Sequence, residues 1–348
     1  MIDKRHIISK DKTLLDALKQ INGIGRGQLV LFVVDSSQRV LGTLTDGDSR
    51  RALINGYGLN VSVEEIMHKD FKFVRENEPN MVEHLKCLKE DLKKLIPVLD
   101  SKNVIVGIID LEKNKTILPI DAVLMAGGKG VRLRPLTEKT PKPLLKVGEK
   151  AIIDYNIDRL IDFGVTHISV TVNYLREQIE QHFKEEYRGI HVSTIREPEF
   201  LGTIGSVKYI KEFYNDTILI MNSDLFTNLN YEDFYLHFKK NDADMSVAAV
   251  PYTVSVPFGI FNLEGRDIKG IQEKPVYNYF ANAGIYLIKR SMLSEIPDGV
   301  FFNATDLIEK LVAQKKKVIR YPLTGFWLDI GSKEEYAKAN ELVKHINN

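Results

Sequence analysis

The sequence predicts an α/β protein whose larger part is a doubly wound, mainly parallel sheet. From residue 117 onward short apolar runs alternate with helical stretches, which is typical of parallel sheets. The first run, Ile120 to Ala126, ends abruptly in glycines. Later strand candidates have the same apolar character and read HISVTVN at 167, IHVSTIRE at 190, TILIMNSD at 217, MSVAAVPY at 245 and AGIYLIK at 283.

The composition indicates an ordinary soluble globular protein of about two domains. Of the 348 residues 44% are hydrophobic, and 48 Lys and Arg against 47 Asp and Glu give a net charge of +1. No global field therefore favours nucleic acid or an acidic membrane surface as a partner. The start lacks an apolar secretion core and no 18-residue apolar run occurs, so we expect a cytoplasmic protein. The single cysteine, Cys87, is expected to pack beside Leu85 and Leu88 on a helix.

The N-terminal third contains an internal repeat with a constant offset of 65 residues. The segment LFVVDSSQRVLGTLTD at 31 aligns with IPVLDSKNVIVGIID at 96, which superimposes Gly42 on Gly107. Each copy reads as a strand, a turn and a strand preceded by an amphipathic helix. One small copy cannot bury its apolar face alone, so we expect the two to pair. The apolar helix positions are Leu14, Leu15, Leu18 and Ile21 in one copy, and Val82, Leu85 and Leu88 in the other.

A polar turn at Glu112 to Lys115, followed by Pro119, marks a domain boundary. We therefore expect a paired module over residues 1–115, with copies at about 1–62 and 63–115. A second domain is expected over 117–348.

The stretch AVLMAGGKGVRLRPLTEKTPKP, which begins at residue 122, predicts a phosphate site. Its glycines let backbone N–H groups approach a ligand closely. Arg132 offers a permanently charged fork for phosphate oxygens, and Lys142 is held between two prolines. Neither the G-x-G-x-x-G nor the Walker A pattern is present. The loop glycines are Gly127, Gly128 and Gly130.

Two aspartates have the character of magnesium ligands. Asp224 directly follows the apolar run TILIMNS, where a strand end would face a cleft, and Asp329 in WLDIGS provides a second carboxylate. Mg²⁺ usually takes one or two carboxylates together with waters and substrate phosphates. An aspartate after a strand can equally form a turn or a helix cap.

The stretch from residue 122 resembles the signature of sugar-phosphate nucleotidyltransferases, G-G-x-G-x-R-L-x-P-L-T followed by P-K-P. The resemblance implies a Rossmann-like, GT-A-type domain that holds an NTP and Mg²⁺. In that family the arginine binds the triphosphate and the lysine supports attack at the α-phosphorus, roles that fall to Arg132 and Lys142. It also implies that Asp224 and Asp329 hold the metal, and that the nucleotide contacts Leu124, Ala126, Gly127, Gly128 and Gly130.

A second family motif, E-K-P, occurs at Glu273 and Lys274. The resemblance implies that this lysine pairs with the phosphate of a sugar 1-phosphate and that the glutamate bonds the sugar. Asn282 and Gly284 lie in a segment that resembles the adjacent sugar-site motif. A second cation away from the NTP site suits an acceptor that is itself an anion. The alternative is an exposed turn.

The segment REPEFLGTIGS resembles the part of the family that reads the base, with Glu197, Gly202 and Thr203 as contacts. An ionised glutamate accepts two hydrogen bonds, and guanine offers two adjacent donors on its pairing edge. Together with the NAGIY segment this resembles mannose 1-phosphate guanylyltransferases, so GTP is the expected substrate. UTP, CTP or dTTP remains the alternative.

The N-terminal repeat resembles a tandem of CBS domains, which often bind adenosine nucleotides between the copies. The first copy has the ribose-binding pattern at Gly42, Thr45 and Asp48, whereas the second has Asp110 and Lys113 at the last two positions. A purine nucleotide effector is therefore an expectation, with a plain polar turn as the alternative. The fusion resembles the glucosamine 1-phosphate guanylyltransferases of nonulosonic (legionaminic) acid pathways.

Together these features predict a homo-oligomeric enzyme that joins an NTP to a mannose- or glucosamine-type sugar 1-phosphate and releases pyrophosphate. A phosphate monoester is largely dianionic at neutral pH, so no general base is needed to create the nucleophile. The alternative is an inactive protein that only senses nucleotides. Retention of all the charged cleft residues favours the enzyme.

Overall fold

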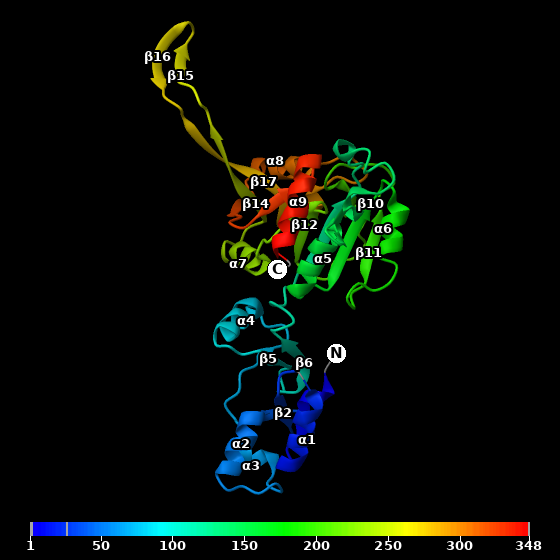
Figure 1. Ribbon diagram of the computed structural model, residues 1–348, viewed down its shortest axis with the longest axis vertical. Helices are drawn as coiled ribbons and strands as arrows, with labels where there is room; N and C mark the ends of the chain where they lie inside the picture. Colours follow the sequence, from blue (N-terminus) through cyan, green and yellow to red (C-terminus); the bar gives the residue numbers. More distant parts are fainter. Residues whose placement is uncertain (1–2, 26, 347–348) are drawn as a thin grey trace. The chain divides into compact units, whose positions relative to one another are not determined.

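The computed structural model describes residues 3–25 and 27–346 and divides the chain into two compact units, Met1–Ile117 and Leu118–Asn348. Figure 1 shows unit 1 in blue to cyan and unit 2 in green to red. None of the described helices is both long and apolar enough to cross a membrane.

Unit 1 contains two three-stranded sheets, ordered β1-β2-β3 and β4-β5-β6. In each sheet the first pair is parallel and the second antiparallel. The strands are β1 (Ile7–Ser9), β2 (Val30–Val34), β3 (Val40–Thr45), β4 (Val74–Arg75), β5 (Leu95–Leu99) and β6 (Ile105–Asp110). The helices are α1 (Leu14–Ile24), α2 (Asp46–Ile54), α3 (Val63–Ile66) and α4 (Met81–Glu90).

The two hairpins of unit 1 repeat each other residue for residue. Val33 pairs with Gly42 and Val98 with Gly107, and each hairpin has a register shift one position later. Two equivalent hydrogen bonds join the hairpins. The Val40 N–H donates to the Asn103 carbonyl (3.0 Å), and the Ile105 N–H donates to the Gln38 carbonyl (3.2 Å). A shared cluster of Phe32, Val34, Val40, Leu99 and Ile105 lies between them. Each copy therefore buries apolar surface against the other.

Cys87 does not pack as the sequence suggested. On α4 the residues Val82, Leu85 and Leu88 are buried, but Cys87 is exposed. Two residues along a helix are about 200° apart, so Cys87 lies nearly opposite Leu85. Its expected place in the apolar stripe was wrong.

Unit 2 is built on a seven-stranded sheet ordered β11-β10-β7-β12-β17-β14-β18. Within it only β17 runs antiparallel to its neighbours, so the predicted mainly parallel α/β sheet is confirmed. The strands are β7 (Asp121–Ala126), β10 (His167–Val172), β11 (Val192–Arg196), β12 (Thr217–Asn222), β14 (Met245–Ser255), β17 (Val276–Lys289) and β18 (Val318–Pro322).

Helices cover both faces of this sheet. Ile218 and Ile220 of β12 pack with Leu307 and Leu311 of α8 on one face. Because side chains alternate along a strand, Met221 points to the other face, where it contacts the Tyr231 hydroxyl of α7 (3.5 Å). The helices are α5 (Ile152–Asp162), α6 (Arg176–His182), α7 (Tyr231–Lys240), α8 (Ala304–Ala313) and α9 (Lys333–Ile346).

Two short pairs complete the body of unit 2, β8 (Lys146–Val147) with β9 (Lys150–Ala151), and β13 (Leu225–Thr227) with β19 (Trp327–Asp329). The second pair is important for the site. Antiparallel pairing of Leu225 with Asp329 brings the end of the chain's last strand beside Asp224. The Ile330 N–H also donates to the Asp224 carbonyl (3.2 Å).

A long β-ribbon, here called the arm (residues 250–281), extends from the sheet. It comprises the outer parts of β14 and β17, paired from Val250 with Ala281 to Ser255 with Val276. It ends in the hairpin β15 (Ile260–Glu264) and β16 (Asp267–Gln272). Figure 1 shows the arm in yellow, projecting beyond the helices of unit 2.

Candidate active site

The glycine loop begins where central strand β7 ends, at the carboxyl edge of the parallel strands, where ligands bind in such sheets. Gly130 has a φ of 60°, in the left-handed region, and an ideal Cβ there would lie 3.2 Å from Lys142 Cβ. At Gly127 a Cβ would lie 2.5 Å from Glu197 Oε1. Both positions therefore need glycine, one for its conformation and one for its closeness to a buried carboxylate.

Lys142 lies at the base of this site. Pro141 precedes the short 3₁₀ turn Lys142–Leu144 with an extended backbone, and the Lys142 side chain is 11% exposed. Its ammonium forms an ion pair with Asp224 Oδ2, and its Nζ is 3.7 Å from Asp329 Oδ1. One lysine thus bridges the two carboxylates that the sequence predicted as metal ligands.

The two aspartates suit a magnesium ion that also binds substrate phosphates. Asp224 Oδ1 is buried without a hydrogen-bond partner in the described chain, so a ligand position is available. Burial raises the pKa of Asp329, the Asp224 charge raises it further, and Lys142 lowers it. Among the described residues no three His, Cys, Asp or Glu side chains form a metal cage. A two-carboxylate site completed by waters and phosphates is what Mg²⁺ usually takes.

Arg132 approaches the same corner from the glycine loop. It belongs to the 3₁₀ turn Val131–Leu133, which Gly130 precedes. An ideal Cβ at Gly331, two residues after Asp329, would lie 2.8 Å from an Arg132 guanidinium nitrogen. The guanidinium therefore lies against bare backbone, and its charge lowers the pKa of Asp329.

Glu197 follows β11 on the far side of the loop and is 2% exposed. Burial raises the pKa of Glu197, and the hydrogen bond from the Leu201 backbone opposes that rise. Hydrogen bonding from the side chains of Ser206, Thr171 and Asn173 also opposes the rise of this pKa, so Glu197 is held by buried polar groups in the wall of the site.

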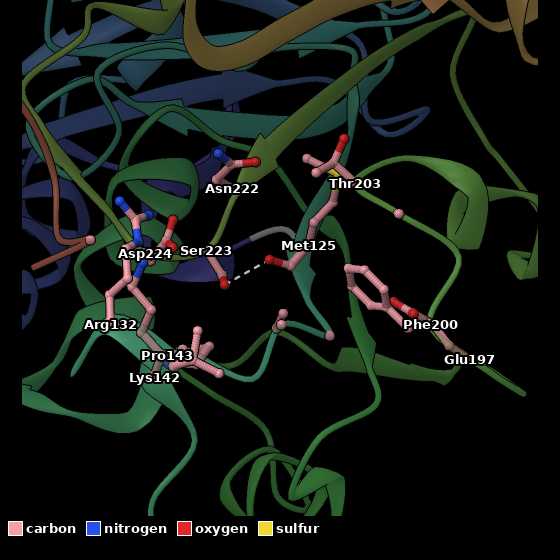
Figure 2. A pocket seen from close by; sticks show the side chains of 17 residues that line it. Met125, Arg132, Lys142, Pro143, Glu197, Phe200, Thr203, Asn222, Ser223 and Asp224 are labelled. Carbon is pink, nitrogen blue, oxygen red and sulfur yellow. Dashed lines mark hydrogen bonds and ion pairs between the residues drawn. The ribbon is translucent and has the colours of Figure 1, made fainter. Parts of the chain in front are cut away.

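The glycine loop, Arg132, Lys142, Asp224 and Glu197 line a cavity of about 310 Å³, whereas Asp329 is not among the lining residues. In Figure 2, Arg132, Lys142 and Asp224 lie on one side of the opening, and Glu197, Phe200 and Thr203 on the other. Apart from these, the predicted residues that line it are Ala126, Gly127, Gly128, Gly130 and Gly202. Leu124 is fully buried in β7 and does not line the cavity.

Some lining residues were not singled out from the sequence. Asn222 and Ser223 directly precede Asp224, and the Ser223 hydroxyl donates to the Met125 carbonyl (2.8 Å), drawn dashed in Figure 2. The sequence offered one indication of their role, since they directly precede the predicted metal ligand Asp224 at the end of a predicted strand. Phe200 also lines the cavity, in the segment predicted to read the base.

The predicted sugar-phosphate residues fall into two groups. Gly284 has a φ of 71° and abuts Asn222, since an ideal Cβ would lie 2.6 Å from the Asn222 Nδ2. The Asn282 Oδ1 accepts the Gly284 N–H (2.9 Å). Glu273 and Lys274, in contrast, are exposed on the arm and do not line the cavity.

In unit 1 the predicted effector residues cap a helix. Thr45 precedes α2, its hydroxyl accepts the Asp48 N–H, and it donates to Asp48 Oδ2 at 2.6 Å. At Gly42 an ideal Cβ would lie 2.7 Å from the His68 carbonyl oxygen. Thr45 also lines a cavity of about 370 Å³ that both copies enclose, together with Thr43, His68, Lys72, Lys93 and Lys94.

Comparison with known proteins identifies the larger unit. The family described as Nucleotidyl transferase matches residues 121–345. The chain belongs to this family. Residues before 121 lie outside the match.

Relatives in the nucleotidyl transferase family are distant. The chain is 29% identical over 228 residues to mannose-1-phosphate guanyltransferase beta-B of Xenopus laevis, which covers 62% of each chain. It is 30% identical over 226 residues to mannose-1-phosphate guanyltransferase of Yarrowia lipolytica, covering 62% of this chain and 61% of that one. The chain thus spans less than two thirds of the length of these relatives.

A solved structure has a related fold. The crystal structure of a Bacillus anthracis protein assigned as a glucose-1-phosphate thymidylyltransferase, in complex with a sucrose, matches with a TM-score of 0.51 and 22% identity. The match covers 65% of this chain and 95% of that one. This likeness concerns the fold of unit 2.

Proposed function

We propose that the protein is a nucleotidyltransferase that joins an NTP to a sugar 1-phosphate and releases pyrophosphate. The observation that carries the proposal is Lys142, which bridges Asp224 and Asp329 beside a glycine loop. Phosphoryl chemistry depends mainly on positioning and charge neutralisation, which is what these groups provide.

Each group has a distinct role in this proposal. The loop N–H groups and Arg132 hold the triphosphate, which orients the α-phosphorus toward the acceptor phosphate. Lys142 stabilises the charge that develops at the α-phosphate as the bond to pyrophosphate breaks. Asp224 and Asp329 would hold Mg²⁺, which neutralises phosphate charge and acts as a Lewis acid. Glu273 and Lys274 would bind the sugar phosphate, with Asn282 and Gly284 beside the sugar.

We propose GTP as the nucleotide. The Glu197 carboxylate in the cavity wall supports this, because guanine offers its N1–H and 2-amino donors side by side. The relatives named as mannose-1-phosphate guanyltransferases support it as well. A mannose- or glucosamine-type sugar 1-phosphate is the acceptor we favour, since both remain consistent with the motifs.

The experiment is a substrate panel. GTP, UTP, CTP, dTTP and ATP are each paired with hexose and hexosamine 1-phosphates in Mg²⁺, and pyrophosphate release is measured. We expect the highest kcat/KM with GTP. Preference for UTP or dTTP would contradict the role of Glu197, and no release with any pair would favour a nucleotide-sensing protein without catalysis.

We further propose that unit 1 is a CBS pair that binds a purine nucleotide and regulates unit 2. The exact 65-residue repeat and the cavity beside Thr45, with its three lysines, support this. The Thr45 hydroxyl and the Asp48 carboxylate would have to exchange their capping bond for bonds to the ligand. Calorimetry of the full chain with AMP, ATP and GTP tests it, with Thr45→Val as the variant expected to lose the extra binding event.

A further inference from the structure

The arm (residues 250–281) is a two-stranded ribbon that exposes many large apolar side chains. Beyond Val250 no third described strand pairs with either of its two strands. A lone two-stranded ribbon is at best marginally stable and usually needs a packing partner. The exposed large apolar residues on it are Tyr252, Val254, Phe258, Phe261, Leu263, Ile268, Ile271, Val276, Tyr279 and Phe280.

This surface is large enough for a stable interface. Five of the six aromatic side chains of the arm are 53% to 71% exposed. At about 200 Å² each they present roughly 600 Å², and the aliphatic residues add to it. Stable interfaces bury about 800 Å² per partner, whereas monomers rarely expose apolar patches beyond a few hundred Å². Counted over both faces of the ribbon, the arm therefore has the dimensions of one side of an interface.

The arm also carries residues that its own catalytic cavity lacks. Lys274 lies ten residues before Gly284, which abuts Asn222 at the cavity. At about 3.3 Å per strand residue, that is roughly 30 Å along a ribbon that Figure 1 shows leading away from the sheet. The cations that line the cavity in the described chain are Arg132 and Lys142, and Lys142 is already paired with two carboxylates. The proposed function assigns both of these cations to the NTP, so in the described chain no further cation lines the cavity for the acceptor phosphate.

We propose that the arm docks on a second copy of this chain and there supplies Glu273 and Lys274 to that copy's cavity. This rests on the proposed function, since it assigns where the acceptor phosphate finds its lysine. A two-fold axis would place both arms reciprocally, so each dimer has two complete sites and buries both apolar ribbons. The arm contains three acidic and three basic residues, a balance that favours neither nucleic acid nor an anionic membrane.

The first experiment measures association. By sedimentation equilibrium we expect the full chain at about twice its 39.7 kDa mass, and the double variant Phe258→Ser, Phe261→Ser as a monomer with unchanged far-UV circular dichroism. Control variants Ile54→Ser and Val312→Ser remove equally exposed apolar residues outside the arm and should stay dimeric. A wild-type monomer, or dimers that survive the arm substitutions, would overturn the proposal.

The second experiment asks whose arm completes a site. Chains carrying Lys274→Ala and Arg132→Ala are co-expressed with different tags, and mixed dimers are isolated through both tags. In a mixed dimer one cavity has an intact Arg132 and receives the intact arm of the other chain. We expect each single variant to be nearly inactive and the mixed dimer to have about half the wild-type rate per dimer.

If the arm acts within its own chain, every site in the mixed dimer carries one defect and no activity is regained. That result would overturn the exchange of arms even if dimers form. A failure of the proposed function can be told apart from a failure of the arm exchange. In that case the wild type would be inactive with every substrate pair, while the sedimentation results would still show whether the arms dock.

Discussion

Replacing Lys142 by methionine separates the structural and catalytic effects of its charge. Methionine keeps much of the apolar stem but removes the ammonium that bridges Asp224 and Asp329. Removing one partner of a buried ion pair typically costs 3–5 kcal/mol. For a unit of this size, a loss of about 3 kcal/mol lowers the melting temperature by roughly 6–12 °C.

This loss should depend on pH and on magnesium. Burial and the Asp224 charge already raise the pKa of Asp329, and without Lys142 that pKa rises further. A raised carboxyl pKa in the folded state means that stability is retained at low pH and lost as pH rises through that value. The variant should therefore lose stability relative to the wild type as pH rises above the ordinary range of an aspartate, and the difference should be larger at pH 7.5 than at pH 5. Mg²⁺ should stabilise the variant more than the wild type, because the resident ammonium no longer competes for the carboxylates.

The assay is a set of thermal melts at pH 5 and 7.5, with and without 10 mM Mg²⁺, alongside pyrophosphate release. Turnover should fall by about 100-fold or more, since a preorganised charge at the reacting phosphate is lost. Lys146→Met is the matched control, because Lys146 is an exposed lysine on β8. If the Lys142→Met protein has the same melting temperature as the wild type at pH 7.5 without Mg²⁺, Lys142 does not stabilise the protein by bridging the two carboxylates.

Three further predictions concern single positions. Asp224→Asn should lower Mg²⁺-dependent turnover at least about 100-fold without changing the circular dichroism spectrum, and near wild-type rates would remove the metal assignment. Burial raises the pKa of Glu197, so Glu197→Gln should raise the melting temperature of the nucleotide-free protein more at pH 8 than at pH 5. The same substitution should lower selectivity for GTP roughly tenfold, and unchanged selectivity would contradict a role of Glu197 in reading the base. Gly130→Ala should lower the free energy of unfolding by about 1–2 kcal/mol and slow turnover, because φ is 60° and the new Cβ would press on Lys142. Gly128→Ala is the control and should keep its stability, because a Cβ there would have no atom within 4 Å.

The sequence predicted strands well where an apolar run matched the whole strand. The apolar runs at 167 and 217 became β10 and β12 with nearly the expected limits. The runs at 245 and 283 became β14 and β17, which are much longer than the apolar core of each run. Side-chain periodicity reports burial, so it could not show that both strands continue into an exposed arm. It also could not show that β17 runs antiparallel.

Long-range contacts in the site were beyond a reading of the sequence. Lys142 and Asp224 were both singled out, but their pairing across 82 residues depends on how β7, β12 and the β13–β19 pair come together. The E-K-P motif gave Glu273 and Lys274 a role without indicating that they lie on the arm. Composition alone cannot reveal such positions, because they follow from strand direction and ribbon length.

The proposed reaction is attack by a sugar 1-phosphate oxygen on the α-phosphorus of the NTP. It is tested most directly with sugar 1-phosphate carrying ¹⁸O in all phosphate oxygens, GTP and Mg²⁺, followed by mass spectrometry of both products. We predict that every labelled oxygen appears in the nucleotide sugar and none in pyrophosphate. Labelled pyrophosphate, release of inorganic phosphate instead, or no nucleotide sugar with any NTP would contradict this account.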